Sequence, residues 1–140
     1  MNDYRYEDLK IGMTESFDVS ITEQMLETFR QLSGDENPLH CDTTFAQGKG
    51  YPSRVCYGML TASFFSTLGG VYLPGKNCLI HSVEVNFKKP VFIGDRLTIL
   101  GEVTELNEMF RRAVIKVTIT NQKNEKVSRG ILKVGVLDEE

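Results

Sequence analysis

The sequence is poor in cysteine, in proline and in positive charge. Its 140 residues include three cysteines and four prolines, and 19 acidic residues outnumber 16 basic ones. Because basic residues are not in excess, the chain lacks the positive electrostatic potential that attracts proteins to the phosphates of nucleic acids. Nucleic acid is therefore not an expected partner. The cysteines are odd in number and widely spaced, so they form no CxxC metal pair and no obvious disulfide framework. We expect no metal site and a reducing, cytoplasmic location.

Long apolar stretches are also absent. The longest, from Met59 to Leu73, is interrupted by serine, threonine and glycine and is shorter than the roughly 18 to 20 residues of a membrane span. The first six residues are polar, so we predict neither a secretory signal nor a membrane partner. What remains is a near-average globular composition, 41% hydrophobic and 25% charged, which predicts one domain over residues 1–140.

The first part of the chain predicts a strand followed by a helix. Residues 13–19 alternate weakly, as a short strand does. Ser20 and Glu23 have the spacing of a capping box, and Gly34 is a natural helix stop. Between them, apolar residues recur at helical intervals: Ile21, Met25, Phe29 and Leu32.

The segment after this helix predicts a loop and a short helical turn. Pro38 disfavours helical geometry at the residue before it and lacks an N–H, so we expect residues 34–40 to form a turn or loop. Asp42 is a candidate cap for a short turn over residues 43–46. Residues 47–53 are polar and rich in glycine, which indicates an exposed loop.

The rest of the chain predicts one long helix and then a sheet. Residues 57–73 are apolar or small on every side, which is typical of a helix surrounded by other structure. Four stretches with a period of two follow, at residues 79–87, 97–103, 110–120 and 126–137. Short polar connections between them suit antiparallel hairpins. Two predicted strand faces are Leu79, His81, Val83, Val85 and Phe87, and then Leu97, Ile99, Gly101 and Val103. The pattern predicts an α+β fold.

Three separated motifs resemble one known family. The run Gly34-Asp35-Glu36-Asn37-Pro38-Leu39-His40, with Ala46 six residues later, is similar to the Gly-Asp-x-Asn-Pro-aliphatic-His signature of the MaoC-like (R)-specific enoyl-CoA hydratases. Tyr57-Gly58-Met59-Leu60 resembles the start of that family's central helix, and the stretch from Pro90 to Asp95 resembles its Pro-Val-x-x-Gly-Asp turn. The resemblance implies the hotdog fold, in which a curved antiparallel sheet wraps around a long central helix.

The first motif carries the expected chemistry. Adding water to a thioester-conjugated double bond needs a group that activates water, a proton donor for the α-carbon and donors that stabilise the enolate. Asp35 and His40 suit the first two tasks. The family implies that both hold one water, with Asp35 favoured as base and His40 as proton relay, although their division of the two steps stays open. Taken singly, Asp35 would be a turn residue and His40 a loop histidine; the complete motif favours a catalytic pair.

The third task points to Gly58. Its N–H, at the start of the buried helix, lacks a partner within the helix and lies at the positive end of the helix dipole, so we predict that Gly58 forms the oxyanion hole. Asn37 should support the site by fixing the loop, and Ser66, which matches a family serine, either supports it or simply bonds the helix backbone. The substrate brings CoA or an acyl carrier, and no other cofactor is expected. Cations available for CoA phosphates are Lys88, Lys89 and Arg54.

Three positions qualify this interpretation. Tyr57 stands where the family often has histidine, and Val83 lies near a position where many hydratases have glutamine, so the acyl group stays open. His81, on an apolar strand face, is interpreted as a core or interface residue rather than a catalyst.

Two rival functions use a similar ligand. A hotdog thioesterase has its acidic residue on or near the central helix, and residues 57–73 contain no Asp or Glu. A non-catalytic module that binds acyl thioesters has no need of an acid–base pair. The sequence therefore favours an enzyme, a hydro-lyase acting on a small-molecule acyl thioester. The family implies that protomers join their sheets edge to edge, so we expect a homodimer or a higher homo-oligomer.

Overall fold

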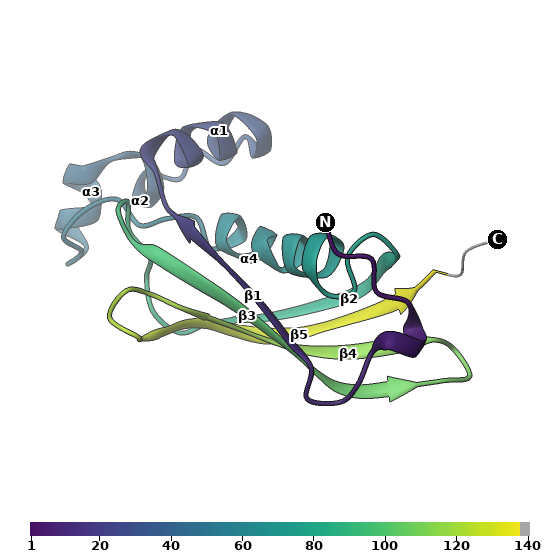
Figure 1. The fold of residues 1–140 in the computed structure, drawn as a ribbon. Helices are drawn as coiled ribbons and strands as arrows, with labels where there is room; N and C mark the ends of the chain where they lie inside the picture. Colours follow the sequence, from purple (N-terminus) through teal and green to yellow (C-terminus); the bar gives the residue numbers. More distant parts are fainter. Residues whose placement is uncertain (138–140) are drawn as a thin grey trace.

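A computed structural model describes residues 1–137, and an antiparallel sheet spans most of its length (Figure 1). Within the described residues the sheet has five strands in the order β1-β3-β4-β5-β2, and every neighbouring pair is antiparallel. The strands are β1 (Thr14–Ser20), β2 (Cys78–Phe87), β3 (Arg96–Asn107), β4 (Arg112–Thr120) and β5 (Lys126–Val136). The predicted strands and their antiparallel pairing are confirmed.

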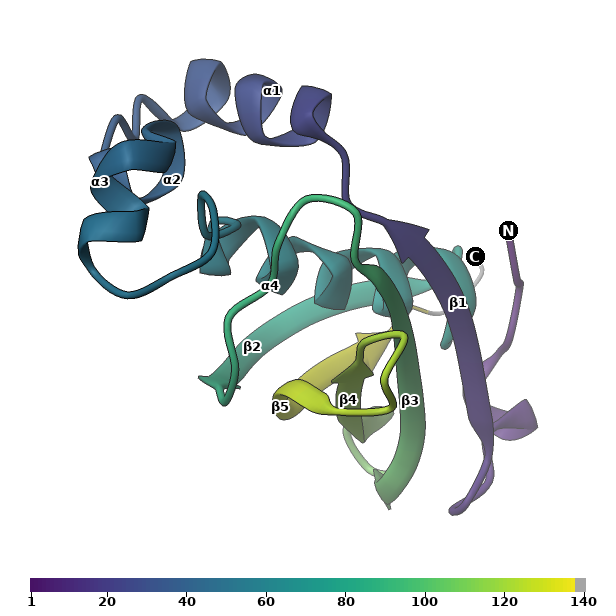
Figure 2. The same cartoon turned by 90° about the vertical axis from the view of Figure 1, so that its left-hand side faces the viewer.

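The helices lie on the concave face of the sheet and at one end of it. Figure 2 shows the sheet curving beneath α4 (Gly58–Thr67), which continues as the π-helical turn η2 (Leu68–Tyr72). Near the N-terminal end of α4 lie α1 (Glu23–Ser33), α2 (Pro38–Cys41) and α3 (Thr43–Gly48), while the 3-10 turn η1 (Tyr6–Asp8) precedes β1. The α+β prediction is confirmed. In the part of the chain that the structure describes, no helix has the length and apolar character to cross a membrane.

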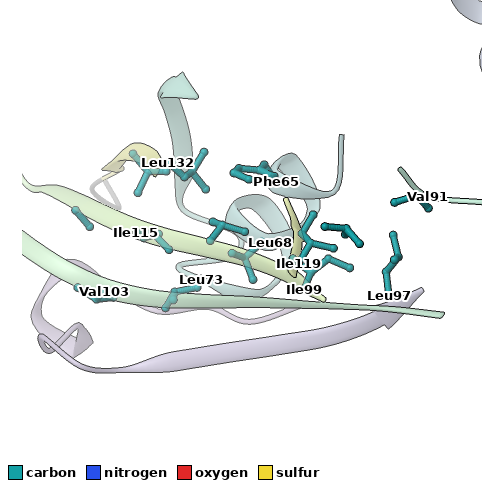
Figure 3. Packing of buried hydrophobic residues seen from close by; sticks show 14 of the residues in the cluster. Phe65, Leu68, Leu73, Val91, Leu97, Ile99, Val103, Ile115, Ile119 and Leu132 are labelled. Atoms are coloured by element: carbon teal, nitrogen blue, oxygen red, sulfur yellow. The ribbon is translucent and has the colours of Figure 1, made fainter. Parts of the chain in front are cut away.

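The hydrophobic core lies between α4 with its π-helical extension and the sheet (Figure 3). Phe65 and Leu68 come from the helical side and are fully buried. They share one cluster with fully buried residues of three strands: Ile99, Ile115 and Leu132. Burying such a side chain contributes about 1.5–3 kcal/mol. On β3 the predicted inward face is confirmed, since Leu97, Ile99, Gly101 and Val103 are all buried.

A gap in the sheet at Gly101 receives the side chain of Leu68. A Cβ at Gly101 would lie 2.3 Å from Leu68 Cδ2 and 3.2 Å from Ile115 Cγ2. Two carbon atoms 2.3 Å apart would overlap, so a larger residue at position 101 would force the buried Leu68 side chain or the helix to move, and glycine avoids this. The Leu68–Gly101 contact therefore fixes where the helix lies along β3.

The predicted face of β2 is correct only in part. The pairing of β2 with β5 shifts between Ile80 and Ser82, and the resulting bulge at His81 reverses the alternation of side chains. The partly buried residues of β2 that pack on the core are consequently Cys78, Ile80 and Val85, of which only Val85 belongs to the predicted face. Leu79, Val83 and Phe87 are exposed. His81 is exposed as well, which removes its interpretation as a core residue and leaves the interface interpretation as a prediction.

Two details of α1 differ from the prediction. Ser20 is still part of β1, so it cannot cap the helix; Thr22 does so instead, by accepting a 3.2 Å hydrogen bond from the N–H of Met25. Leu32, expected on the inner face, is 81% exposed, and the buried residue of this helix is Leu26. The apolar spacing located the helix but not the face that packs.

One face of α4 is open within the described chain. Thr61 and Phe65 are buried, whereas Met59 is 66% exposed and both Ser63 and Ser66 are exposed. The prediction that other parts of the chain surround this helix on every side is therefore wrong for residues 1–137. In Figure 2 the sheet lies on one side of α4 and α1 lies on the other.

Candidate active site

The predicted catalytic segment starts where α1 ends. Gly34 has a left-handed conformation, with φ 74°, which stops the helix as predicted. Asp35 follows on the surface, and its Oδ1 accepts a 3.0 Å hydrogen bond from the N–H of Asn37. Asn37 Oδ1 in turn accepts a 3.0 Å bond from the N–H of Leu39. Asn37 thus makes the side-chain-to-backbone contact expected of it, while its supporting role in catalysis stays a prediction.

His40 lies on a helix and not on the predicted loop. The short helix α2 begins at Pro38, and proline suits the first position of a helix because no N–H partner is needed there. Asn37, the residue before it, has φ −55° and ψ 126°, outside the helical region as expected. The restriction that a proline imposes acts on the residue before it, so Pro38 constrains Asn37 and leaves His40 free to be helical.

Two hydrogen bonds join α2 to the segment that precedes α4. The N–H of Val55 donates to the carbonyl of Leu39 at 3.1 Å, and the carbonyl of Val55 lies 2.7 Å from His40 Nδ1. A carbonyl can only accept, so Nδ1 carries the proton and Nε2 of the neutral ring keeps its lone pair. His40 Nε2 is therefore able to take a proton from water and to return it.

His40 and Gly58 line the same pocket, which has a volume of about 290 Å³. Gly58 is the first residue of α4, so its N–H has no partner within the helix. A Cβ at this position would come within 3.1 Å of Phe87 Cε1, which favours glycine. The buried residues Thr61 and Ser128 add hydroxyl groups to the wall. An imidazole, a helix N-terminus and hydroxyls around one pocket suit a substrate whose reacting group becomes negatively charged.

Two predicted site residues lie outside this lining. Within residues 1–137, the pocket is lined by His40 and Gly58 but by neither Asp35 nor Ser66. Asp35 lies on the exposed turn five residues before His40. Ser66 is exposed on α4, about 12 Å beyond Gly58 at 1.5 Å per residue. The structure brings His40 and Gly58 together, and the roles of Asp35 and Ser66 stay predictions.

The three cations expected near CoA phosphates are placed differently. Lys88 and Lys89 both line the pocket. Lys89 is already paired with Glu125, whereas no carboxylate among the described residues lies at ion-pair distance from Lys88. Arg54 is bonded to α1, through Glu27 at 3.0 Å and a second glutamate, and its side chain is only 12% exposed. Lys88 is thus the cation best placed for a phosphate at this pocket.

Tyr57 belongs to the site, and the sequence argument treated it only as a departure from the family. Its ring stacks on the ring of His40, with centroids 4.2 Å apart. Its hydroxyl donates a 2.6 Å hydrogen bond to the backbone carbonyl of Asp35. These contacts join residues 17 and 22 positions apart, and no local pattern signals them. The only signal in the sequence was that Tyr57 directly precedes Gly58, the predicted oxyanion donor.

Two cysteines lie at or near the pocket. Burial raises the pKa of the Cys56 thiol to about 11, so this pocket residue stays protonated near neutral pH. Cys41 lies beside the Tyr57 hydroxyl, with its Sγ 3.4 Å away. Over residues 1–137 the structure has no group of three His, Cys, Asp or Glu side chains that could hold a metal ion.

The sequence is similar to those of two bacterial enzymes. A 3-hydroxybutyryl-CoA dehydratase of Methylorubrum extorquens is 35% identical over 113 residues, which cover 81% of this chain and 72% of that protein. An (R)-specific enoyl-CoA hydratase of Rhodospirillum rubrum is 38% identical over 101 residues, which cover 72% of this chain and 70% of that protein.

The fold matches those of solved (R)-hydratases. The R-hydratase PhaJ1 of Pseudomonas aeruginosa superposes with a TM-score of 0.92 at 28% identity, covering 98% of this chain and 88% of that one. The (R)-hydratase of Aeromonas caviae gives a TM-score of 0.89 at 34% identity, covering 93% and 98%. These likenesses confirm the predicted hotdog fold. The model of the family described as "MaoC like domain" matches residues 9–127, and the chain therefore belongs to the MaoC-like domain family.

Proposed function

We propose that this protein adds water to a trans-2-enoyl-CoA to give the (R)-3-hydroxyacyl thioester and catalyses the reverse dehydration. Asp35 and His40 act as the acid–base pair, and the N–H of Gly58 acts as the oxyanion donor. The observation that supports this most directly is that His40 and Gly58 line one pocket, with His40 Nε2 left available by the bond from Nδ1 to Val55. The protein is a hydro-lyase, the class of its relatives named hydratase and dehydratase.

The reaction needs only proton transfer and charge stabilisation. The water oxygen bonds to C3 as the electron pair of the C2–C3 double bond moves toward the thioester carbonyl. The pair takes one proton from that water, with Asp35 as the base and His40 Nε2 as the relay. The N–H of Gly58 stabilises the negative charge on the thioester oxygen. When the enolate collapses, C2 receives a proton from the pair, so every atom of water ends in the product and no further cofactor is required.

The substrate is an acyl thioester whose carrier, either CoA or an acyl carrier protein, stays attached throughout the reaction. Lys88 lies at the wall of the pocket and can meet a phosphate of either carrier. The apolar part of the wall includes Val55, Phe87 and Val91, which suits the uncharged part of the substrate.

We also propose that the protein is a homodimer or a larger homo-oligomer in the cytoplasm. Strand β2 is at an edge of the sheet, and its residues Leu79, Val83 and Phe87 are about half exposed. The open face of α4 carries Met59, which is also exposed. A second copy that paired with the β2 edge would cover both surfaces. The three unpaired thiols suit a reducing compartment. Light scattering on the purified protein measures the oligomeric state.

The decisive experiment follows the ultraviolet absorbance of the conjugated thioester over a panel of enoyl-CoAs of different length and branching. The wild-type protein should hydrate at least one of them. Asp35→Asn and His40→Ala should each lower kcat about 100- to 10,000-fold, the usual contribution of general acid–base catalysis, with the thermal midpoint retained. Chiral chromatography of the released 3-hydroxy acid identifies the configuration. Near wild-type rates in both variants would rule out the pair.

A second assay separates the rival functions. A hydratase releases no thiol from a saturated acyl-CoA, whereas a thioesterase does, and a thiol reagent reports the difference. Thiol release that survives Asp35→Asn would favour a thioesterase. Tight binding of CoA without turnover of any enoyl-CoA would favour a binding module.

A further inference from the structure

We propose that Tyr57 is a positioning residue that holds the Asp35 turn, the His40 ring and the start of α4 in one fixed arrangement. This inference rests on the proposed function, because it assigns a role through Asp35 and His40. Tyr57 is 2% exposed, so it contacts no solvent and acts only through its neighbours. It immediately precedes Gly58, and its ring and its hydroxyl reach the other two elements.

The hydroxyl of Tyr57 holds the Asp35 turn. It donates a 2.6 Å hydrogen bond to the Asp35 carbonyl, which lies on an otherwise exposed segment. Because that proton is committed to the carbonyl, the Cys41 thiol 3.4 Å away must be the donor of the second contact to the Tyr57 oxygen. One oxygen thus joins the end of α1 to the end of α2.

The ring of Tyr57 holds the imidazole of His40. The two rings stack with centroids 4.2 Å apart and an interplanar angle of 30°. The ring of Tyr57 also packs against the ring of Phe29 in α1, with the two ring centroids 4.8 Å apart. The bond from His40 Nδ1 to Val55 fixes the ring at one edge, and the stack fixes its face, so together they set the direction of Nε2.

The Tyr57 hydroxyl keeps its proton, and so remains a hydrogen-bond donor. Burial, together with the neighbouring Cys41 thiol, raises the pKa of Tyr57 above its ordinary value. The hydroxyl therefore stays protonated near neutral pH, and its hydrogen bond to the Asp35 carbonyl persists there.

The test compares two tyrosines that each donate one short hydrogen bond. Tyr57→Phe keeps the ring and removes the bond to Asp35. Tyr4→Phe is the matched control, because the Tyr4 hydroxyl donates a 2.7 Å bond to Glu15 of β1 and not to the Asp35 turn, while neither tyrosine is among the residues lining the pocket. We expect Tyr57→Phe to lower kcat about tenfold, as slight misplacement of reacting groups does, with KM and the thermal midpoint no more changed than in Tyr4→Phe.

A spectroscopic readout does not depend on turnover. The chain has two histidines, so an NMR spectrum of the imidazole groups contains one signal set from His40 and one from His81, and His40→Ala assigns them. In Tyr57→Phe the His40 signals should shift or broaden, because the turn beside the ring is released, while the His81 signals stay in place. Tyr4→Phe should change neither set.

Each outcome decides the proposal. Unmoved His40 signals in Tyr57→Phe overturn it, whatever the activity. A kcat equal to that of Tyr4→Phe also overturns it, because positioning without an effect on turnover is merely structural. If the wild-type protein hydrates no enoyl-CoA, the proposed function fails, and the His40 signals alone then decide whether Tyr57 positions the ring.

Discussion

The sheet core and the layer of α1, α2 and α3 are held together by different kinds of contact. The centre of the core between α4 and the sheet consists of apolar side chains that are fully buried, such as Phe65 and Leu132. Within α1 to α3 only Leu26 and Ala46 are buried, as far as the described residues go. That layer is organised instead by side chains that bond to backbone, contributed by Thr22, Asp35, Asn37, His40, Asp42 and Tyr57.

This difference suggests that the core determines the stability of the fold, whereas the helical layer determines the positions of the side chains around the pocket. Apolar burial is non-directional, and it makes the largest favourable contribution to the free energy of folding. A single hydrogen bond contributes only about 0.5–1.5 kcal/mol net, but it fixes direction. Changes in the core should therefore lower stability more than activity per folded molecule, and changes around the pocket should do the reverse.

The largest effect tests the core side of the comparison. Phe65→Ala should lower the free energy of unfolding by about 3–5 kcal/mol, because it removes a fully buried ring and leaves a cavity. Urea denaturation measures this loss, and kcat corrected for the folded fraction should change little. Phe110→Ala is the control, since Phe110 is 60% exposed, and it should cost less than about 1 kcal/mol. Equal losses in the two variants would remove the distinction.

A smaller effect tests the pocket side. Gly58→Ala places a methyl group within 3.1 Å of the Phe87 ring, so either the ring or the helix end must shift. We expect kcat/KM for an enoyl-CoA to fall about tenfold, with the thermal midpoint nearly unchanged. Gly48→Ala is the matched control, because a Cβ at Gly48 meets nothing within 4 Å. Unchanged kinetics in Gly58→Ala would contradict the oxyanion assignment.

The smallest effect concerns the charged rim of the pocket. Lys88→Ala should raise KM for a CoA substrate about two- to fivefold, the effect of one exposed charge pair. Lys89→Ala should raise it less, because Glu125 already neutralises Lys89. Steady-state kinetics at two salt concentrations measure both, and the Lys88 effect should shrink at high salt. A larger effect at Lys89 would show that the carrier arm takes a different path.

The sequence predicted the sheet well wherever burial follows a period of two. On β3 the inward residues Leu97 to Val103 are those that the alternation named. On β2 the same reasoning failed at His81, because a bulge inserts one residue into the pattern and no residue type marks its position. Asp42 capping α3 was also predicted correctly, since an N-cap is a local signal.

The candidate site was predicted in part. The motifs named His40 and Gly58, and the structure brings both to one pocket. The sequence did not locate Asp35 and Ser66 relative to that pocket, because position depends on how α1 and α4 pack rather than on spacing. The contacts of Tyr57 were missed for the same reason, as they join segments that meet only in the folded chain.

The glycine gap in β3 has a consequence beyond packing. Leu68, which fills the gap at Gly101, is ten residues after Gly58, or about 15 Å along the helix. Because a helix is stiff over that length, the place where Leu68 is anchored sets the place of the Gly58 amide at the other end. An error of about 1 Å in that amide is enough to cost up to 100-fold in rate. Gly101 does not line the pocket, yet we predict that a larger residue there lowers turnover as well as stability, because it would displace the proposed oxyanion donor.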